Sequence, residues 1–130
     1  MRLLLDTHVA IWALTEPDRI PPRILDAIGD PENEVLVSAV AFWEVAIKHR
    51  LARSDSPPFT GHEAIGYFAQ VGFAVLNVTA AHAAMVERLP LLHADPFDRL
   101  MLAQTIVEGL QFVTCDRHLS RYDVPMLTWS

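Results

Sequence analysis

The sequence has 130 residues, 52% of them hydrophobic, and carries 10 Lys and Arg against 16 Asp and Glu, a formal net charge of −6. This length suits one domain over residues 1–130, and the apolar content excludes intrinsic disorder. The single cysteine excludes a disulfide framework and favours a reducing compartment, so we expect a cytoplasmic protein, and no apolar run approaches the ~18 residues that cross a membrane.

The first half of the chain alternates short apolar runs with segments of helical character. Strands are predicted at Leu3–Leu5 and at Glu34–Ser38, and helices are predicted to begin within Val9–Leu14, to run from Pro21-Pro22 to about Ile28 before Gly29, and to cover Ala39–Leu51. In the last of these helices, Val40, Trp43, Ile47 and Leu51 recur at helical spacing. We therefore expect this apolar stripe, Trp43 included, to face the core.

The second half continues the same alternation after a loop at Arg53–Pro58. It is predicted to contain a helix from the capping box at Thr60 to about Val71, a strand at Phe73–Val78, a helix from Thr79 to about Leu89, a helix from Asp95-Pro96 to Gly109, a strand at Gln111–Thr114 and a short strand at Met126-Leu127. Apolar strands that alternate with amphipathic helices imply a parallel sheet covered on both faces, so the predicted fold class is α/β.

Four acidic residues fall where a parallel sheet would bring them to one edge. Asp6 and Asp116 lie just past the first and fourth predicted strands, and ligands of open α/β sheets bind beyond the carboxyl ends of the strands. Glu44 lies one and a half turns into the helix after the second strand, and Asp98 lies in the first turn of the helix before the fourth. We therefore expect the four carboxylates to reach the same rim.

Each of these acids also has a purely structural explanation. Asp6 could cap the helix that follows it, and Asp116 could be an ordinary turn residue. Asp98 lies near a helix N-terminus, where the helix dipole favours a negative charge. Glu44 could pair with Lys48 four residues further along the helix, an interaction worth about 0.2–0.5 kcal/mol.

Glu44 fits its structural explanation least well. Its neighbours at helical spacing are Val40, Ala41, Ile47 and Leu51, so it lies on the margin of the predicted core-facing stripe, where an unpaired carboxylate is costly. Each close pair of carboxylates would also cost roughly 4 kcal/mol at an effective dielectric constant of about 20. A divalent cation would remove this repulsion, and oxygen ligands select Mg²⁺ or Mn²⁺.

Four segments match the motifs of a known family, in family order and over nearly the full chain. They are LLLDTHVAIWAL, VSAVAFWEVAIK, HADPFDRLMLAQTIVEGL and FVTCDRHLSRYDV. On these motifs the chain resembles the PIN-domain ribonucleases, and among them the VapC toxins of type II toxin–antitoxin modules. The resemblance implies a three-layer α/β/α PIN-like domain whose central parallel sheet converges on an acidic metal site.

The resemblance also implies site residues and partners. The family's catalytic and metal-binding acids fall on Asp6, Glu44, Asp98 and Asp116, and the hydroxyl before the last acid falls on Thr114, which would position that acid or a metal-bound water. The implied activity is that of an Mg²⁺- or Mn²⁺-dependent endoribonuclease that hydrolyses RNA with metal-activated water. The implied assembly is a cytoplasmic homodimer, away from membranes, with a small VapB-like antitoxin as its partner.

Other polar residues lie close to these motifs. We expect Asp95 to cap its helix first and to act as an outer ligand second, and we favour Arg99 bracing Asp98 by an ion pair over contacting a phosphate. For His8 and His93 a structural role is favoured over contact with the substrate or with the ligands. Cys115 has no base that the sequence identifies, so packing near the strand end is favoured over a role as nucleophile.

Several other functions compete with the nuclease interpretation. A phosphatase of the haloacid dehalogenase type would need a second Asp where the chain has His8, and a receiver-like module would need adjacent acids after the first strand. The histidines lack the spacing of a zinc site. The remaining alternative is a PIN-like scaffold that binds RNA or protein without cutting. Separately, Phe59 lies with Pro57 and Pro58 in a loop and could face a partner.

Overall fold

The computed structural model describes residues 1–130 and contains one five-stranded sheet in which every pair of neighbours is parallel. The strands are β1 (Arg2–Leu5), β2 (Glu34–Ser38), β3 (Ala74–Leu76), β4 (Gln111–Thr114) and β5 (Met126–Thr128). Their order across the sheet is β3-β2-β1-β4-β5. The predicted α/β class and parallel sheet are confirmed.

The helices cover both faces of this sheet. They are α1 (Thr7–Thr15), α2 (Pro22–Gly29), α3 (Ala39–Leu51), α4 (Gly61–Gln70), α5 (Ala80–Met85) and α6 (Pro96–Glu108), with short 3-10 helices at Pro17–Arg19, Val86–Arg88 and Leu119–Arg121. The predicted capping box is present at Thr60 and Glu63, and Gly109 ends α6 with φ of 65°. No helix has the length and apolarity required to span a membrane.

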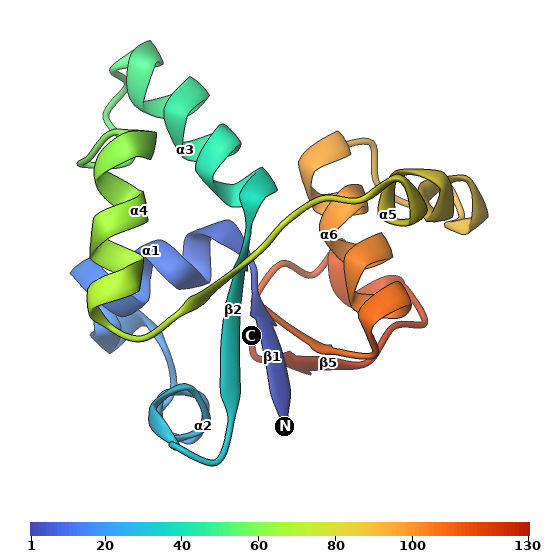
Figure 1. Ribbon diagram of the computed structural model, residues 1–130, viewed down its shortest axis with the longest axis horizontal. Coiled ribbons are helices and arrows are strands. Elements are labelled where there is room, and N and C mark those ends of the chain that lie inside the picture. The colour runs from blue at the N-terminus through green and yellow to red at the C-terminus, as the bar shows by residue number, and fades with distance from the viewer.

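The alternation of side chains along the strands divides the core into two halves. In β1, Leu3 and Leu5 pack into one cluster, whereas Leu4 faces the other cluster. Helices α1, α2 and α4 lie on the first side of the sheet, and α5 and α6 lie on the second (Figure 1). The result is the predicted three-layer α/β/α arrangement.

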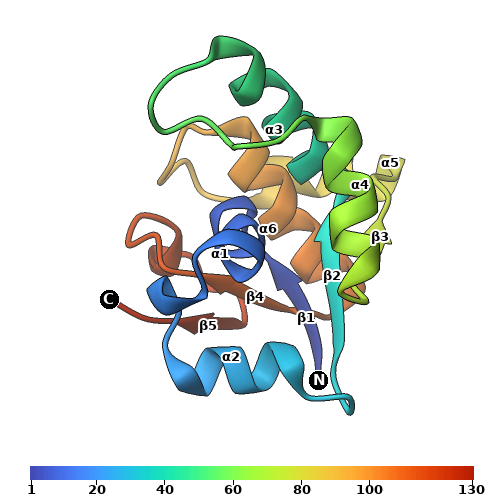
Figure 2. The same ribbon diagram turned by 90° about the vertical axis from the view of Figure 1, so that its left-hand side faces the viewer.

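Strand register aligns the ends of the three central strands. Leu5 at the end of β1 pairs with Val37 of β2 and with Val113 of β4. The chain turns back from β3 to β4 across β1, so the topological switch lies between β1 and β4, where open α/β sheets bind ligands. Figure 2 shows α3 above this carboxyl edge and α2 at the opposite end of the strands.

The predicted buried stripe of α3 is wrong beyond Val40. Trp43 is 60% exposed, and Ile47 and Leu51 are exposed as well. The buried face consists of Val40, Ala41, Glu44 and Val45. The helix packs against α4 so closely that a Cβ on Gly61 would lie 2.9 Å from the Cβ of Ala46. Trp43 lies off this buried face and packs edge-on against Phe97 of α6.

The loop before α4 also differs from expectation. Phe59, predicted to be free for a partner, is 6% exposed and belongs to the core cluster. Its ring packs edge-to-face against Tyr67 and Phe68 of α4. The side chain therefore anchors the start of α4 and is not a docking residue.

Candidate functional site

The first acid of the site, Asp6, follows β1 and is 5% exposed. It occupies the N-cap position of α1, but its side chain makes no capping hydrogen bond. The Thr114 hydroxyl donates a hydrogen bond of 2.7 Å to Asp6 Oδ2 instead. Burial raises the pKa of Asp6, and repulsion by Glu44 adds to this, while the Thr114 hydrogen bond and attraction by His8 oppose it.

The second acid, Glu44, is buried on α3 and has two partners. The Thr7 hydroxyl donates a hydrogen bond of 2.8 Å to Glu44 Oε1, and the Lys48 ammonium contacts Oε2. Burial lowers the pKa of Lys48, but the hydrogen bond and attraction from Glu44 outweigh it, so this pKa is raised. The ion pair anticipated as the structural explanation of Glu44 is thus present, and the same carboxylate lines the cleft described below.

The third and fourth acids meet beside a histidine. Ligand atoms of His93, Asp98 and Asp116 all lie within 4.8 Å of one another, and His93 Nε2 is 3.0 Å from Asp98 Oδ2. Burial, followed by repulsion from Asp6, Asp95, Glu44 and Asp116, raises the pKa of Asp98 to about 8. The four predicted acids therefore interact electrostatically, as their positions at one sheet edge require.

The structure gives the roles of two neighbouring residues, Asp95 and Thr114. Asp95 caps α6 as predicted, because Oδ1 accepts hydrogen bonds from the backbone N–H groups of Phe97 and Asp98. Thr114 was expected to position the last acid or a water, but its hydroxyl donates to Asp6, and its oxygen accepts the backbone N–H of Asp116. The hydroxyl thus links the first and last acids.

Arg99 neither pairs with Asp98 nor faces the cleft, so both expectations for it are wrong. Its guanidinium is buried and donates to the carbonyls of Val86, Leu89 and Pro90 and to the Tyr122 hydroxyl. Arg99 therefore fixes the segment between α5 and α6. Sequence reasoning missed Tyr122, since its partners lie more than 20 residues away along the chain and no local pattern indicates them.

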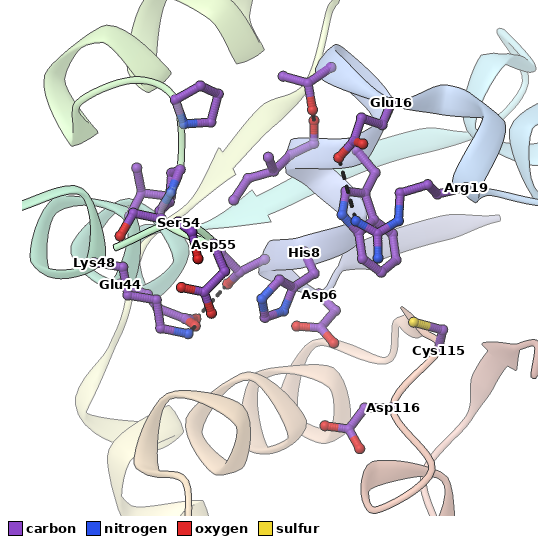
Figure 3. A pocket seen from close by; sticks show the side chains of 18 residues that line it. Asp6, His8, Glu16, Arg19, Glu44, Lys48, Ser54, Asp55, Cys115 and Asp116 are labelled. Atoms are coloured by element: carbon purple, nitrogen blue, oxygen red, sulfur yellow. Dashed lines mark hydrogen bonds and ion pairs between the residues drawn. The ribbon is translucent and has the colours of Figure 1, made fainter. Parts of the chain in front are cut away.

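A cleft of about 720 Å³ opens beside these acids and is lined mainly by polar residues. Figure 3 shows Asp6 between Glu44 and Asp116, with Lys48 and Arg19 on the surrounding walls. The loop from Ser54 to Pro58 forms part of the rim. The cleft thus combines buried carboxylates with exposed cations, an arrangement suited to a polyanion held by metal and by positive side chains.

Cys115, His8 and His93 also lie close to the acids. Burial and the charges of Asp6 and Asp116 raise the pKa of the Cys115 thiol, which disfavours the nucleophilic thiolate. His8 lines the cleft, whereas His93 contacts Asp98 directly, so the structural role favoured for His93 is replaced by contact with a site acid.

The residues fit a divalent ion on chemical grounds. Buried carboxylates that repel one another need either protons or a cation, and burial followed by this repulsion raises the pKa of both Asp6 and Asp98. The available donors are mainly carboxylate oxygens, which suit Mg²⁺ or Mn²⁺. Asp98 and Asp116 lie in one closely spaced set of ligand atoms, and Asp6 and Glu44 lie outside that set.

The chain is similar to several known proteins. The chain is 29% identical over 98% of its length to Ribonuclease VapC22 of Mycobacterium tuberculosis, of which it also covers 98%. Its fold matches VapBC2 from Rickettsia felis bound to a promoter DNA fragment, with a TM-score of 0.72, 14% identity and full coverage of both chains. It also matches DNA-bound VapBC from Salmonella typhimurium, with a TM-score of 0.68, 16% identity and coverage of 100% and 99%. The family model of the PIN domain matches residues 3–125, and the chain therefore belongs to the PIN domain family.

Proposed function

We propose that this protein is an Mg²⁺- or Mn²⁺-dependent endoribonuclease and the toxin of a type II toxin–antitoxin pair. The observation that carries the proposal is the set of four interacting acids, Asp6, Glu44, Asp98 and Asp116, at the switch point of the parallel sheet. Support also comes from the relative in Mycobacterium tuberculosis, which is named a ribonuclease. The chain would act as a single PIN-like unit over residues 1–130.

In this proposal the four acids hold the divalent ion and Thr114 keeps Asp6 in place. The ion would supply a water of lowered pKa and would stabilise the charge on the phosphodiester. The hydrogen bond from Thr114 to Asp6 Oδ2 favours the ionised carboxylate, which is the form that binds metal. Burial of Asp6 and Glu44 on the cleft wall limits competing water around the carboxylates.

Two cations of the cleft would bind the RNA backbone. Lys48 contacts Glu44, and this ammonium would be free to contact a substrate phosphate once a divalent ion neutralises the carboxylate. Arg19 stacks over the Trp12 ring, with the guanidinium carbon 4.1 Å from the ring centroid. Each of these cations offers a charge-assisted contact to a phosphate oxygen.

The partner in this proposal is a small VapB-like antitoxin, and the active form is a cytoplasmic homodimer. An acidic cleft is open to blockade by an arginine of such a partner, whose planar guanidinium matches a carboxylate. The match to VapBC structures from Rickettsia felis and Salmonella typhimurium supports this choice of partner. We expect the chain to copurify with a small protein encoded by a neighbouring gene. We also expect the chain to be toxic to cells that produce it without that protein.

The test is cleavage of total RNA by the purified chain with Mg²⁺, with Mn²⁺ and with EDTA. Asp6→Asn is the test variant, and Asp26→Asn, an exposed acid of α2 at the other end of the sheet, is the matched control. We expect metal-dependent cuts by the wild type and by Asp26→Asn, and none by Asp6→Asn. RNA binding without cleavage at any metal concentration would favour the alternative of a non-catalytic PIN-like scaffold.

A further inference from the structure

His93 brings the one nitrogen donor into the closely spaced set of ligand atoms formed with Asp98 and Asp116. The residue lies in the segment between Val86–Arg88 and α6, five positions before Asp98. Its imidazole Nε2 lies 3.0 Å from Asp98 Oδ2, and its side chain is 23% exposed. The nitrogen therefore faces a site acid, and the side chain is partly accessible to solvent.

The backbone and ring of His93 are fixed by contacts outside the acid cluster. Its backbone N–H donates a hydrogen bond of 3.1 Å to the Tyr122 hydroxyl, which also accepts a bond of 3.0 Å from buried Arg99. The ring stacks parallel to the His118 ring, with centroids 5.7 Å apart and 5° between the planes. The His118 backbone N–H in turn donates to Asp116 Oδ1. His118 thus links His93 to Asp116.

The spacing of the two donor atoms fits two neighbouring ligands of one ion. Octahedral ligands at about 2.1 Å from a metal lie about 3.0 Å from each other at adjacent positions. The distance from His93 Nε2 to Asp98 Oδ2 has this value. In the metal-free chain the same distance allows a hydrogen bond between the two atoms.

We propose that His93 Nε2 is a direct ligand of the divalent ion, together with Asp98 and Asp116, and that it makes the site prefer Mn²⁺ to Mg²⁺. The proposal rests on the metal-dependent function above and adds a ligand that the acid set does not contain. Imidazole nitrogen binds later transition ions more readily than Mg²⁺, which keeps to oxygen. If His93 only held Asp98 through a hydrogen bond, its loss would weaken both ions equally.

The test is pulsed electron paramagnetic resonance of Mn²⁺ bound to the full chain, with all histidines labelled with heavy nitrogen. Direct ligation gives a hyperfine coupling between Mn²⁺ and the labelled imidazole nitrogen. The variants are His93→Gln, which retains a polar atom of similar reach, and His8→Gln and His118→Gln, which remove the other two imidazoles near the acids. His62→Gln, on an exposed position of α4, is the distant control.

We expect the coupling in the wild type and in the His8, His118 and His62 variants, and its loss in His93→Gln alone. Calorimetric titration should show that His93→Gln lowers the affinity for Mn²⁺ much more than the affinity for Mg²⁺. A wild-type spectrum with Mn²⁺ bound but no nitrogen coupling would overturn the proposal, even where RNA cleavage is intact. A coupling that persists in His93→Gln would also overturn it, and failure of the wild type to bind Mn²⁺ would remove the proposed function as well.

Discussion

The Thr114 hydroxyl joins the ends of two adjacent strands by donating a hydrogen bond of 2.7 Å to Asp6 Oδ2. Thr114 is the last residue of β4, and Asp6 directly follows β1. The same hydroxyl oxygen accepts the backbone N–H of Asp116. One buried side chain therefore holds the first and last acids of the site in fixed relation across the topological switch.

Thr114→Val keeps the shape of this side chain and removes the hydroxyl. We expect a loss of roughly 1.5–3 kcal/mol in the free energy of unfolding at neutral pH, since the hydrogen bond is buried and charge-assisted. The pKa of Asp6 should rise further, which moves the acid limb of the cleavage profile to higher pH. Urea unfolding and a pH–rate profile measure the two effects. Thr114→Ser should restore both, and an unchanged acid limb in Thr114→Val would refute the assignment.

The raised pKa of Asp98 predicts how stability depends on pH without metal. Between the ordinary carboxyl value of 3.8 and about 8, the folded chain binds a proton that the unfolded chain has lost. The free energy of unfolding in EDTA should therefore fall as pH rises through this range, by up to about 1.4 kcal/mol per pH unit. Thermal melts between pH 5 and 9, in roughly half-unit steps, measure this dependence.

Asp98→Asn should remove most of this loss, because an amide has no proton to lose. We expect the metal-free variant to be more stable than the wild type above pH 8, and Mn²⁺ to stabilise the wild type but not the variant. Asp26→Asn serves as the matched control and should keep the wild-type slope. Parallel stability curves for wild type and Asp98→Asn would show that Asp98 does not retain a proton in the folded chain.

Arg99 is predicted to support the site from a distance. Arg99→Met leaves several buried carbonyl groups of the segment between α5 and α6 without a donor, so we expect a loss of roughly 3 kcal/mol in the free energy of unfolding. Arg99→Lys should recover only part of it, because an ammonium lacks the planar set of five donors. Urea unfolding measures both variants, and equal stability of Arg99→Met and wild type would contradict the role described.

The close approach of α3 and α4 predicts opposite effects for two glycines of α4. A Cβ on Gly61 would lie 2.9 Å from both the Ala46 Cβ and the Phe42 carbonyl oxygen, whereas a Cβ on Gly66 meets nothing within 4 Å. Gly61→Ala should therefore destabilise the protein by about 1–3 kcal/mol, and Gly66→Ala should stabilise it by up to about 1 kcal/mol. The denaturant midpoints of the two variants measure these changes in stability. A stabilising effect of Gly61→Ala would contradict the close packing of α3 on α4.

The order of strands and helices could be read from the sequence because local patterns determine it. The strand at Glu34–Ser38 matches its predicted bounds, and the capping residues Thr60 and Asp95 make the hydrogen bonds that their spacing predicts. The position of the acids at one edge followed from the parallel sheet alone. Strand order and register could not be predicted, since they depend on pairings between distant segments.

The errors have physical causes of the same kind. Trp43 has the spacing of a core residue, but the buried face of α3 runs through Ala41, Glu44 and Val45 and leaves the indole outside. Arg99 stands next to Asp98, yet its guanidinium points to carbonyls before α6 and to Tyr122. A linear pattern does not show which way a side chain points around its helix. It also does not show which partners the tertiary structure brings to that side chain.

The central claim is that the acid site hydrolyses RNA with water as the nucleophile. Cleavage of a defined RNA in water enriched in heavy oxygen, with Mn²⁺ present, tests it most directly through mass spectrometry of the product ends. Attack by water should place one heavy oxygen in the new terminal phosphate, in a reaction that EDTA abolishes and that Asp98→Asn slows by several orders of magnitude. Product ends that carry a cyclic phosphate without the label would contradict it, because the ribose hydroxyl would then be the nucleophile.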